Sequence, residues 1–235
     1  MTTHQTVSRD EWLQARRDLL AKEKAFTKLR DQLSADRRAM PWVKVEDYVF
    51  DGPSGKVRLS DLFRGESQLI IYHLMFNPSW ESACKSCSFW ADNFANIIVH
   101  LNARDTNLAA VSRAPLEKLQ AFKKRMGWNF EWVSCGSEGK FNHDFGTAFT
   151  REEIDRPDHN YNYGSTHFGI EDAPGISVFF KDADGSLYHT YSCYSRGLDM
   201  LNGAYHYLDI VPMGRDEEGL KPHMAWVRLH DEYGK

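Results

Sequence analysis

The sequence predicts an α/β protein in which helices cover the faces of a β-sheet. One observation is a continuous apolar run at residues 68–76, which is typical of a strand buried on both faces. A second is the order strand, helix, strand, helix, strand from there to residue 134, which predicts parallel neighbouring strands. A third is the pair of strand-like segments that flank Asp184-Gly185 and add a hairpin.

Length and charge exclude several classes of protein. The chain has 235 residues, one elaborated domain or two small ones at roughly 150 residues per domain, and no linker or repeat divides it. With 29 basic and 33 acidic side chains its net charge is −4, which argues against nucleic acid as a partner. It has neither the ~20 apolar residues of a membrane span nor the basic, apolar start of a signal peptide. We therefore expect a soluble, cytoplasmic protein with no membrane partner.

Residues 1–40 predict an N-terminal amphipathic helical extension. Ser8 and Glu11 have the spacing of a capping box, and the helix should end near Met40 and Pro41. Between these ends, apolar residues recur at helical spacing with charged residues among them. They are Trp12, Leu13, Leu19, Leu20, Phe26, Leu29 and Leu33. The helix could pack on its own domain or on a second subunit, which would make the protein a homodimer.

Residues 41–235 predict the α/β domain. Alternating segments at 43–50 and 56–59 flank a Gly-Pro-Ser-Gly turn and predict a hairpin. The helix expected at 115–126 has proline in its first turn and Gly127 at its end. Further strands are expected at 107–112, 130–134, 176–181 and 187–193, further helices at 60–63, 84–101 and 196–208, a loop-rich insertion at 136–175 and a polar tail at 210–235.

The cysteines are the most informative residues. Cys84, Cys87, Cys135 and Cys193 are too few and too unevenly spaced for a disulfide scaffold. The first two form a Cys-x-x-Cys pair at the start of a predicted helix, where free N–H groups and Lys85 favour a thiolate. This predicts Cys84 as the nucleophile and Cys87 as the resolving thiol of disulfide exchange. Cys135 and Cys193 each stand alone in the sequence and are expected to be structural.

Two other interpretations of the cysteine pair stay open. Half a zinc site would need two more ligands, and the sequence offers one candidate pair, His189 and Cys193, far downstream. Alternatively, the two thiols are inert and buried, because free cysteine packs well in cores.

Several segments together resemble one bacterial family. They are Cys84-Lys-Ser-Cys-Ser-Phe-Trp-Ala-Asp92, Val111-Ser-Arg-Ala-Pro115, Arg125-Met-Gly-Trp128, Tyr188-His-Thr-Tyr191 and Tyr207-Leu-Asp209. The sequence is similar to domain-of-unknown-function family 899, whose members are described as thioredoxin-like or as predicted dithiol–disulfide oxidoreductases. The resemblance implies a thioredoxin-like three-layer fold of the peroxiredoxin-like branch. It has a central mixed sheet flanked by helices, to which the N-terminal extension and the loop-rich insertion are added.

The chain departs from thioredoxins and peroxiredoxins around the cysteines. Thioredoxins have Gly-Pro between the cysteines and a tryptophan directly before them, whereas this chain has Lys-Ser and places Trp80 four residues upstream. They also have a cis-proline before the strand that faces the disulfide, for which Pro174 is the candidate. The peroxiredoxin motif Pro-x-x-x-Thr-x-x-Cys is approached from Pro78, but Cys84 comes one residue early, which disfavours a thiol peroxidase.

Exchange also needs proton transfer, and the strand at 68–76 lacks the aspartate that thioredoxins carry there. His73 could serve, or could be a hydrogen-bonded core histidine. Arg113 ends a predicted strand, where α/β folds build sites, or it forms an ion pair or a helix cap. Asp92 lies two turns beyond Cys84, too far to act directly. Three residues of the insertion could cover the site or pack the loop: His143, Tyr161 and Tyr163.

The expected function is that of a thiol–disulfide oxidoreductase with no bound organic cofactor and no metal ion. Its partners would be a disulfide-containing protein or a small thiol substrate, together with a recycling reductant. One alternative is a thioredoxin-fold protein that binds a metal or a partner through Cys84, Cys87 and a histidine without turnover. The other is a thiol peroxidase.

Overall fold

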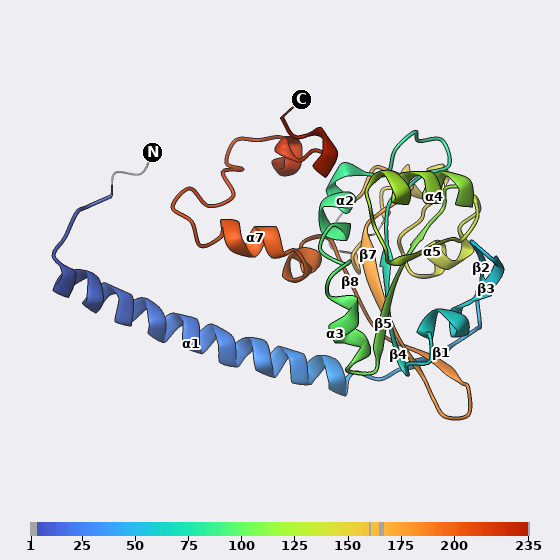
Figure 1. The fold of residues 1–235 in the computed structure, drawn as a ribbon, viewed down its shortest axis with the longest axis horizontal. Helices are drawn as coiled ribbons and strands as arrows, with labels where there is room; N and C mark the ends of the chain where they lie inside the picture. The colour runs from blue at the N-terminus through green and yellow to red at the C-terminus, as the bar shows by residue number, and fades with distance from the viewer. Residues whose placement is uncertain (1–3, 160, 165–166, 235) are drawn as a thin grey trace. The chain divides into compact units, whose positions relative to one another are not determined.

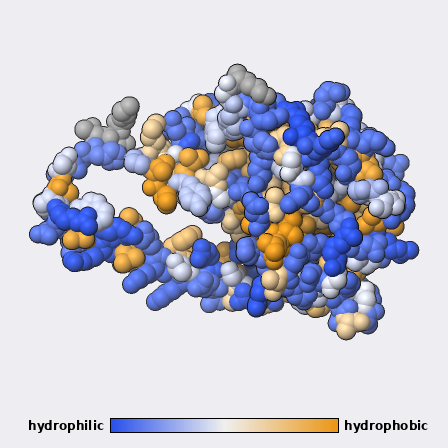
Figure 2. All heavy atoms as spheres, viewed as in Figure 1, coloured by the Kyte–Doolittle hydropathy of each residue, from blue (hydrophilic) through white to orange (hydrophobic). Residues whose placement is uncertain are grey.

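The computed structural model describes residues 4–159, 161–164 and 167–234, and the chain forms two compact units, Met1–Pro41 and Trp42–Lys235 (Figure 1). The described residues of the first unit contain one helix, α1 (Arg9–Ala39). It has the expected capping box, in which the Ser8 N–H donates to the Glu11 carboxylate over 2.9 Å. The helix ends as expected, because Pro41 disfavours helical backbone at Met40. None of its residues is buried, and Figure 2 shows apolar side chains among polar ones along it.

In the described part of the second unit, eight strands form one sheet in the order β1-β8-β7-β4-β5-β6-β2-β3. Its centre is parallel, since β5 pairs in parallel with both β4 and β6. The hairpin of β7 and β8 extends it antiparallel from the other side of β4. The sheet is therefore mixed, as expected for a thioredoxin-like fold. The strands are β1 (Val43–Val45), β2 (Val49–Gly52), β3 (Gly55–Arg58), β4 (Gln68–His73), β5 (Thr106–Ser112), β6 (Glu131–Ser134), β7 (Gly175–Lys181) and β8 (Leu187–Tyr194).

Helices pack on both faces of this sheet and give the fold its three layers. On one face, α2 (Lys85–Ala91) and α4 (Leu116–Arg125) bury apolar side chains against the central strands. On the other face, the 3-10 helix η1 (Leu59–Phe63) and α5 (Lys140–Asp144) do the same. Side chains alternate between the two faces along each strand, so neighbouring residues of β4 enter different cores. No helix within the described ranges has the length and apolar character that crossing a membrane requires.

The single strand expected at 43–50 is wrong. β1 pairs with β8 at one edge of the sheet, whereas β2 pairs with β3 at the other edge. Between them the chain crosses over, and the Asp47 carboxylate accepts hydrogen bonds from the Ser60 N–H and hydroxyl over 2.9 and 2.8 Å. β1 alternates apolar and polar residues whereas β2 does not, and neither local pattern shows that the two strands belong to opposite edges.

Two expected helices are interrupted at asparagines. The segment 84–101 forms α2 and then α3 (Ile98–Asn102), and between them the Asn93 side chain donates to the Phe89 carbonyl over 2.9 Å. The segment 196–208 forms the 3-10 helix η2 (Ser195–Leu201) and α7 (Gly203–Leu208), which Asn202 caps. Asparagine side chains compete for backbone groups in this way and end helices. The remaining helices are α6 (Arg151–Ile154), η3 (His223–Trp226) and η4 (His230–Glu232).

Candidate functional site

The cysteine pair lies where β4 returns to a helix. After β4 the chain forms a loop, and the Cys84 N–H donates to the Met75 carbonyl over 3.0 Å. Cys84 stands directly before α2, half-buried, and Cys87 lies one turn further on, buried in the core. Both are free thiols. The structure thus brings the two cysteines together as the motif predicts.

The two thiols have opposite electrostatic environments. Hydrogen bonds lower the pKa of Cys84 to about 6, although burial raises it. The largest contribution comes from the hydrogen bond of the Cys87 thiol. Smaller contributions come from the N–H groups of Cys87 and Ser86 and from the Ser86 hydroxyl. Burial raises the pKa of Cys87 well above its usual value. Near neutral pH the pair therefore holds one proton, on Cys87, and Cys84 is the thiolate.

Tyr72 is a site residue that the sequence analysis missed. It lies in β4, is buried, and places its hydroxyl 3.4 Å from the Cys87 carbonyl oxygen and in hydrogen-bond contact with the Cys87 thiol. Burial raises the pKa of this phenol well above its usual value, so the group is a hydrogen-bond donor. The alternation of side chains along a strand could have indicated it, because of two neighbouring residues in β4 one faces α2 and the other faces away.

His73, the residue proposed for proton transfer, is the one that faces away. It packs in the opposite core, with its ring stacked 5.4 Å from that of Phe141. Nδ1 lies 2.9 Å from Asn142 Oδ1, and Nε2 lies 2.9 Å from Ser177 Oγ. Burial lowers the pKa of His73 to about 4. Its place on the far face contradicts a role beside the cysteines and fits the alternative, a hydrogen-bonded core histidine.

Lys85 lies between the two cysteines and Trp80 lies before them, and both contact the surrounding structure. The Lys85 ammonium donates to the Ala225 carbonyl over 3.3 Å and so fastens the C-terminal segment to α2. The tail at 210–235 was expected to be polar, but two of its apolar residues, Val227 and Leu229, are buried. Trp80 packs partly buried against the core that contains Cys87, and its carbonyl accepts from the Lys118 ammonium over 2.9 Å.

Pro174 stands directly before β7, whose first residue, Gly175, pairs with the last residue of β4. Among the described residues the one cis peptide bond precedes Pro222, so the bond before Pro174 is trans. Pro174 thus differs from the cis-proline of thioredoxins. Its carbonyl accepts a hydrogen bond from the Tyr161 hydroxyl.

Arg113 directly follows β5 and forms an ion pair, which is one of the structural roles expected for it. Its Nη1 lies 3.5 Å from the buried Asp172 carboxylate, and its Nε and Nη2 donate to the Ser137 carbonyl over 3.0 and 2.8 Å. Asn77, in the loop that leads to the cysteines, donates to the same Asp172 over 2.7 Å. Burial raises the pKa of the nearby Cys135 thiol to about 12.

The other polar candidates bind structural partners. Tyr161 is buried, and its hydroxyl also accepts from the Ser195 N–H over 2.9 Å. Asp92 accepts from the Trp128 ring N–H over 2.7 Å. The partners of the remaining two are the Ser192 carbonyl for Tyr163 and the Glu153 carboxylate for His143.

A zinc site at the cysteines has little support. Within the described ranges, no group of three or more His, Cys, Asp or Glu side chains could hold a metal ion. The candidate pair on β8 is also divided between the two cores, since His189 packs on Phe145 and Cys193 lies in the cluster that contains Cys87.

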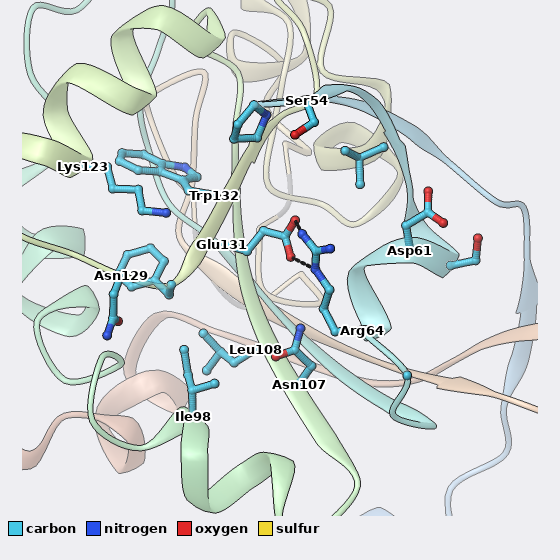
Figure 3. A pocket seen from close by; sticks show the side chains of 15 residues that line it. Ser54, Asp61, Arg64, Ile98, Asn107, Leu108, Lys123, Asn129, Glu131 and Trp132 are labelled. Carbon is cyan, nitrogen blue, oxygen red and sulfur yellow. Dashed lines mark hydrogen bonds and ion pairs between the residues drawn. The ribbon is translucent and has the colours of Figure 1, made fainter.

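A broad hollow of about 990 Å³ lies between the β2–β3 turn, η1, α4 and β6 (Figure 3). Arg64 reaches across it and donates from Nε and Nη2 to the Glu131 carboxylate over 2.8 and 2.6 Å. Neither cysteine lines this hollow. We therefore define the candidate site by the cysteine pair and not by this hollow.

The structure combines a mixed sheet between two layers of helices with a low-pKa cysteine that is paired to a buried thiol. The chain belongs to the family described as "Bacterial protein of unknown function (DUF899)", whose model matches residues 1–233. Comparison with curated protein sequences gives no match.

Solved structures similar to this chain include two peroxiredoxin-type proteins and a DsbE protein. Peroxidoxin BcpB from Mycobacterium tuberculosis has 15% identity and a TM-score of 0.47, covering 69% of this chain and 93% of its own. A cysteine-to-serine mutant of PrxQ from Xylella fastidiosa has 13% identity and a TM-score of 0.44, covering 70% and 94%. A putative thiol:disulfide interchange protein DsbE from Chlorobium tepidum has 14% identity and a TM-score of 0.40, covering 67% and 92%.

Proposed function

We propose that this protein is a thiol–disulfide oxidoreductase in which Cys84 is the nucleophile and Cys87 the resolving thiol. The observation that carries the proposal is the pair itself. Four hydrogen bonds, two from backbone N–H groups, one from a hydroxyl and one from the second thiol, hold Cys84 as a thiolate. A thiolate that is half-buried beside a protonated partner is equipped for both steps of exchange.

The reaction proceeds in two displacements. The Cys84 thiolate attacks one sulfur of a substrate disulfide, forms a mixed disulfide and releases the other substrate sulfur as a thiolate. Cys87 then loses its proton and attacks the Cys84 sulfur, which closes the Cys84–Cys87 disulfide. The second substrate sulfur leaves and takes up a proton. The substrate gains two electrons and the protein loses two, so no organic cofactor is needed.

A disulfide-containing protein or a small disulfide is the substrate of this scheme, and a separate thiol reductant returns the pair to the dithiol. The free thiols suit a reducing compartment, and we place the reaction in the cytoplasm.

The test is the pH dependence of alkylation of the reduced protein, with modified cysteines identified by peptide mass. We expect Cys84 to react with an apparent pKa near 6 and Cys87 to lag behind it. Cys84→Ser should abolish insulin or small-disulfide reduction, whereas the matched control Cys135→Ser should retain it. Alkylation of Cys84 only above the ~8.5 of a free thiol would refute the proposal.

A thiol peroxidase is the second candidate, because a half-buried thiolate next to a resolving thiol also suits peroxide. Cys84 would attack a hydroperoxide, become a sulfenic acid and release an alcohol, and Cys87 would then form the disulfide and release water. Hydroperoxide-dependent labelling of Cys87→Ser protein by a sulfenic acid reagent tests this. Labelling on Cys84 supports peroxidase activity, and its absence at millimolar peroxide excludes it.

A further inference from the structure

The core around Cys87 leaves its sulfur few polar neighbours. Cys87 is 2% exposed and lies in an apolar cluster with residues such as Phe94, Ala110 and Ile176. Any thiolate formed there must be stabilised by hydrogen bonds, because an isolated charge in an apolar core is costly. Yet the second displacement requires Cys87 to lose its proton in that position. Some group in the core must therefore donate a hydrogen bond to the Cys87 thiolate.

Tyr72 is placed to do this by the register of the sheet. Ala110, Tyr72, Ile176 and Cys193 lie directly opposite one another on β5, β4, β7 and β8, and all belong to the cluster that contains Cys87. Tyr72 is thus a central position beneath α2. Phe94 holds its ring in an edge contact, with centroids 5.1 Å apart. A strand residue in a packed core keeps its hydroxyl in one place.

The Tyr72 hydroxyl has one proton to donate, and Cys87 offers it two acceptors, a carbonyl oxygen and a sulfur. The carbonyl oxygen is 3.4 Å away, which is long for a hydrogen bond from a hydroxyl, and the thiol is the second acceptor. A neutral thiol is a weak acceptor, but a thiolate is a strong one. When Cys87 ionises, the O–H bond of Tyr72 turns to the sulfur. The Met75 N–H is a second, fixed donor to the same sulfur.

We propose that Tyr72 is a catalytic residue of the resolving step, its hydroxyl stabilising the Cys87 thiolate as it attacks the mixed disulfide. The inference rests on the proposed function and deepens it. The proton of Cys87 leaves to the departing substrate sulfur or to water, the Tyr72 proton stays on its oxygen, and the new bond joins the sulfurs of Cys87 and Cys84. In the reverse direction, the same hydroxyl stabilises Cys87 as the leaving group when a reductant attacks Cys84.

The experiment is the reaction of reduced, full-length protein with 5,5′-dithiobis(2-nitrobenzoate), which separates the two displacements. Cys84 releases one equivalent of thionitrobenzoate, and the attack of Cys87 on the mixed disulfide releases a second. We expect Tyr72→Phe to leave the first phase within about twofold of wild type and to slow the second at least tenfold. The pH midpoint of the second phase should rise by about one unit, because loss of the donor makes the thiolate harder to form.

Tyr205→Phe is the matched control. Tyr205 is buried in the same cluster, in edge contact with Trp90 of α2, but its hydroxyl donates to Glu217 over 2.9 Å. We expect both phases of this variant to match wild type, which separates the Tyr72 hydroxyl from any general effect on the core. An unchanged second phase in Tyr72→Phe, or equal slowing of both phases, would overturn the inference. Wild-type protein that releases a single equivalent would instead overturn the proposed function.

Discussion

At the scale of single residues, the chemistry of the site depends on which donors reach Cys84. Its thiolate form is stabilised by hydrogen bonds from Ser86 and Cys87, so the low pKa is a local property of the turn that carries the motif. The Cys135 thiol behaves differently: burial raises its pKa to about 12 and outweighs the hydrogen bonds from the N–H groups of Asn142 and Cys135, which lower it. The contrast shows that burial opposes the thiolate and that hydrogen bonding decides the outcome.

Ser86→Ala tests this balance, because it removes one side-chain donor and keeps both backbone donors. We expect the pKa of Cys84 to rise by about half a unit to one unit, and its alkylation at pH 6 to slow severalfold. Ser88→Ala is the control, since the Ser88 hydroxyl donates to the Cys84 carbonyl oxygen over 2.9 Å. A pKa that rises equally in both variants would contradict the assignment and indicate a general effect on α2.

At the scale of elements, the sequence predicted the strands and helices that have a strong local pattern. The run at 68–76, the helix ended by Gly127 and the capping box at Ser8 all reappear in the structure. The pairing of the strands could not be predicted from the sequence, because β1 and β2 join opposite edges of the sheet although they are close in sequence. The cysteine pair was found from its spacing and its place at the start of a predicted helix, whereas Tyr72 required knowing which face of β4 receives α2.

The exposed stripe of α1 leads to a prediction about assembly. Trp12, Leu19, Phe26 and Leu33 follow at seven-residue intervals, and each is between 47% and 65% exposed. A seven-residue apolar repeat is the seam of paired helices, so we expect α1 to pair with α1 of a second copy. Replacing Leu19 and Phe26 with Glu should raise the dissociation constant of the dimer by ~100-fold or more.

Light scattering over a concentration series measures this change. The control places two glutamates two residues further along the helix, on a different face, as Ala21→Glu with Lys28→Glu, and should leave the dimer intact. Wild-type protein that is monomeric at all concentrations, or a Leu19 and Phe26 variant that stays dimeric, would refute pairing through α1. Activity of the variant in disulfide reduction reports that the second unit remains folded.

At the scale of the whole molecule, the sheet separates two kinds of chemistry. One face of the sheet receives the thiols and Tyr72. The opposite face carries a hydrogen-bonded chain that runs from His73 through Ser177 and Ser192 to His189, with contacts of 2.9, 2.8 and 2.7 Å. Its first three members are buried and His189 is half-buried, so the chain contributes to stability. The titration of His73 should therefore appear in the unfolding equilibrium and be absent from the kinetics of the cysteines.

The stability of the fold should fall in mild acid for this reason. Burial lowers the pKa of His73 to about 4, whereas an unfolded histidine titrates near 6.5, so the unfolded chain binds the extra proton between these values. The stabilisation is complete above pH 6.5 and is lost as the pH falls towards 4, amounting to about 3 kcal/mol.

Urea unfolding from pH 7.5 to 4 measures this loss of stability. His73→Gln should be less stable at pH 7.5 and lose less on acidification, whereas His206→Gln, which replaces an exposed histidine, should retain the wild-type slope. Equal slopes for all three proteins would show that other groups cause the acid sensitivity.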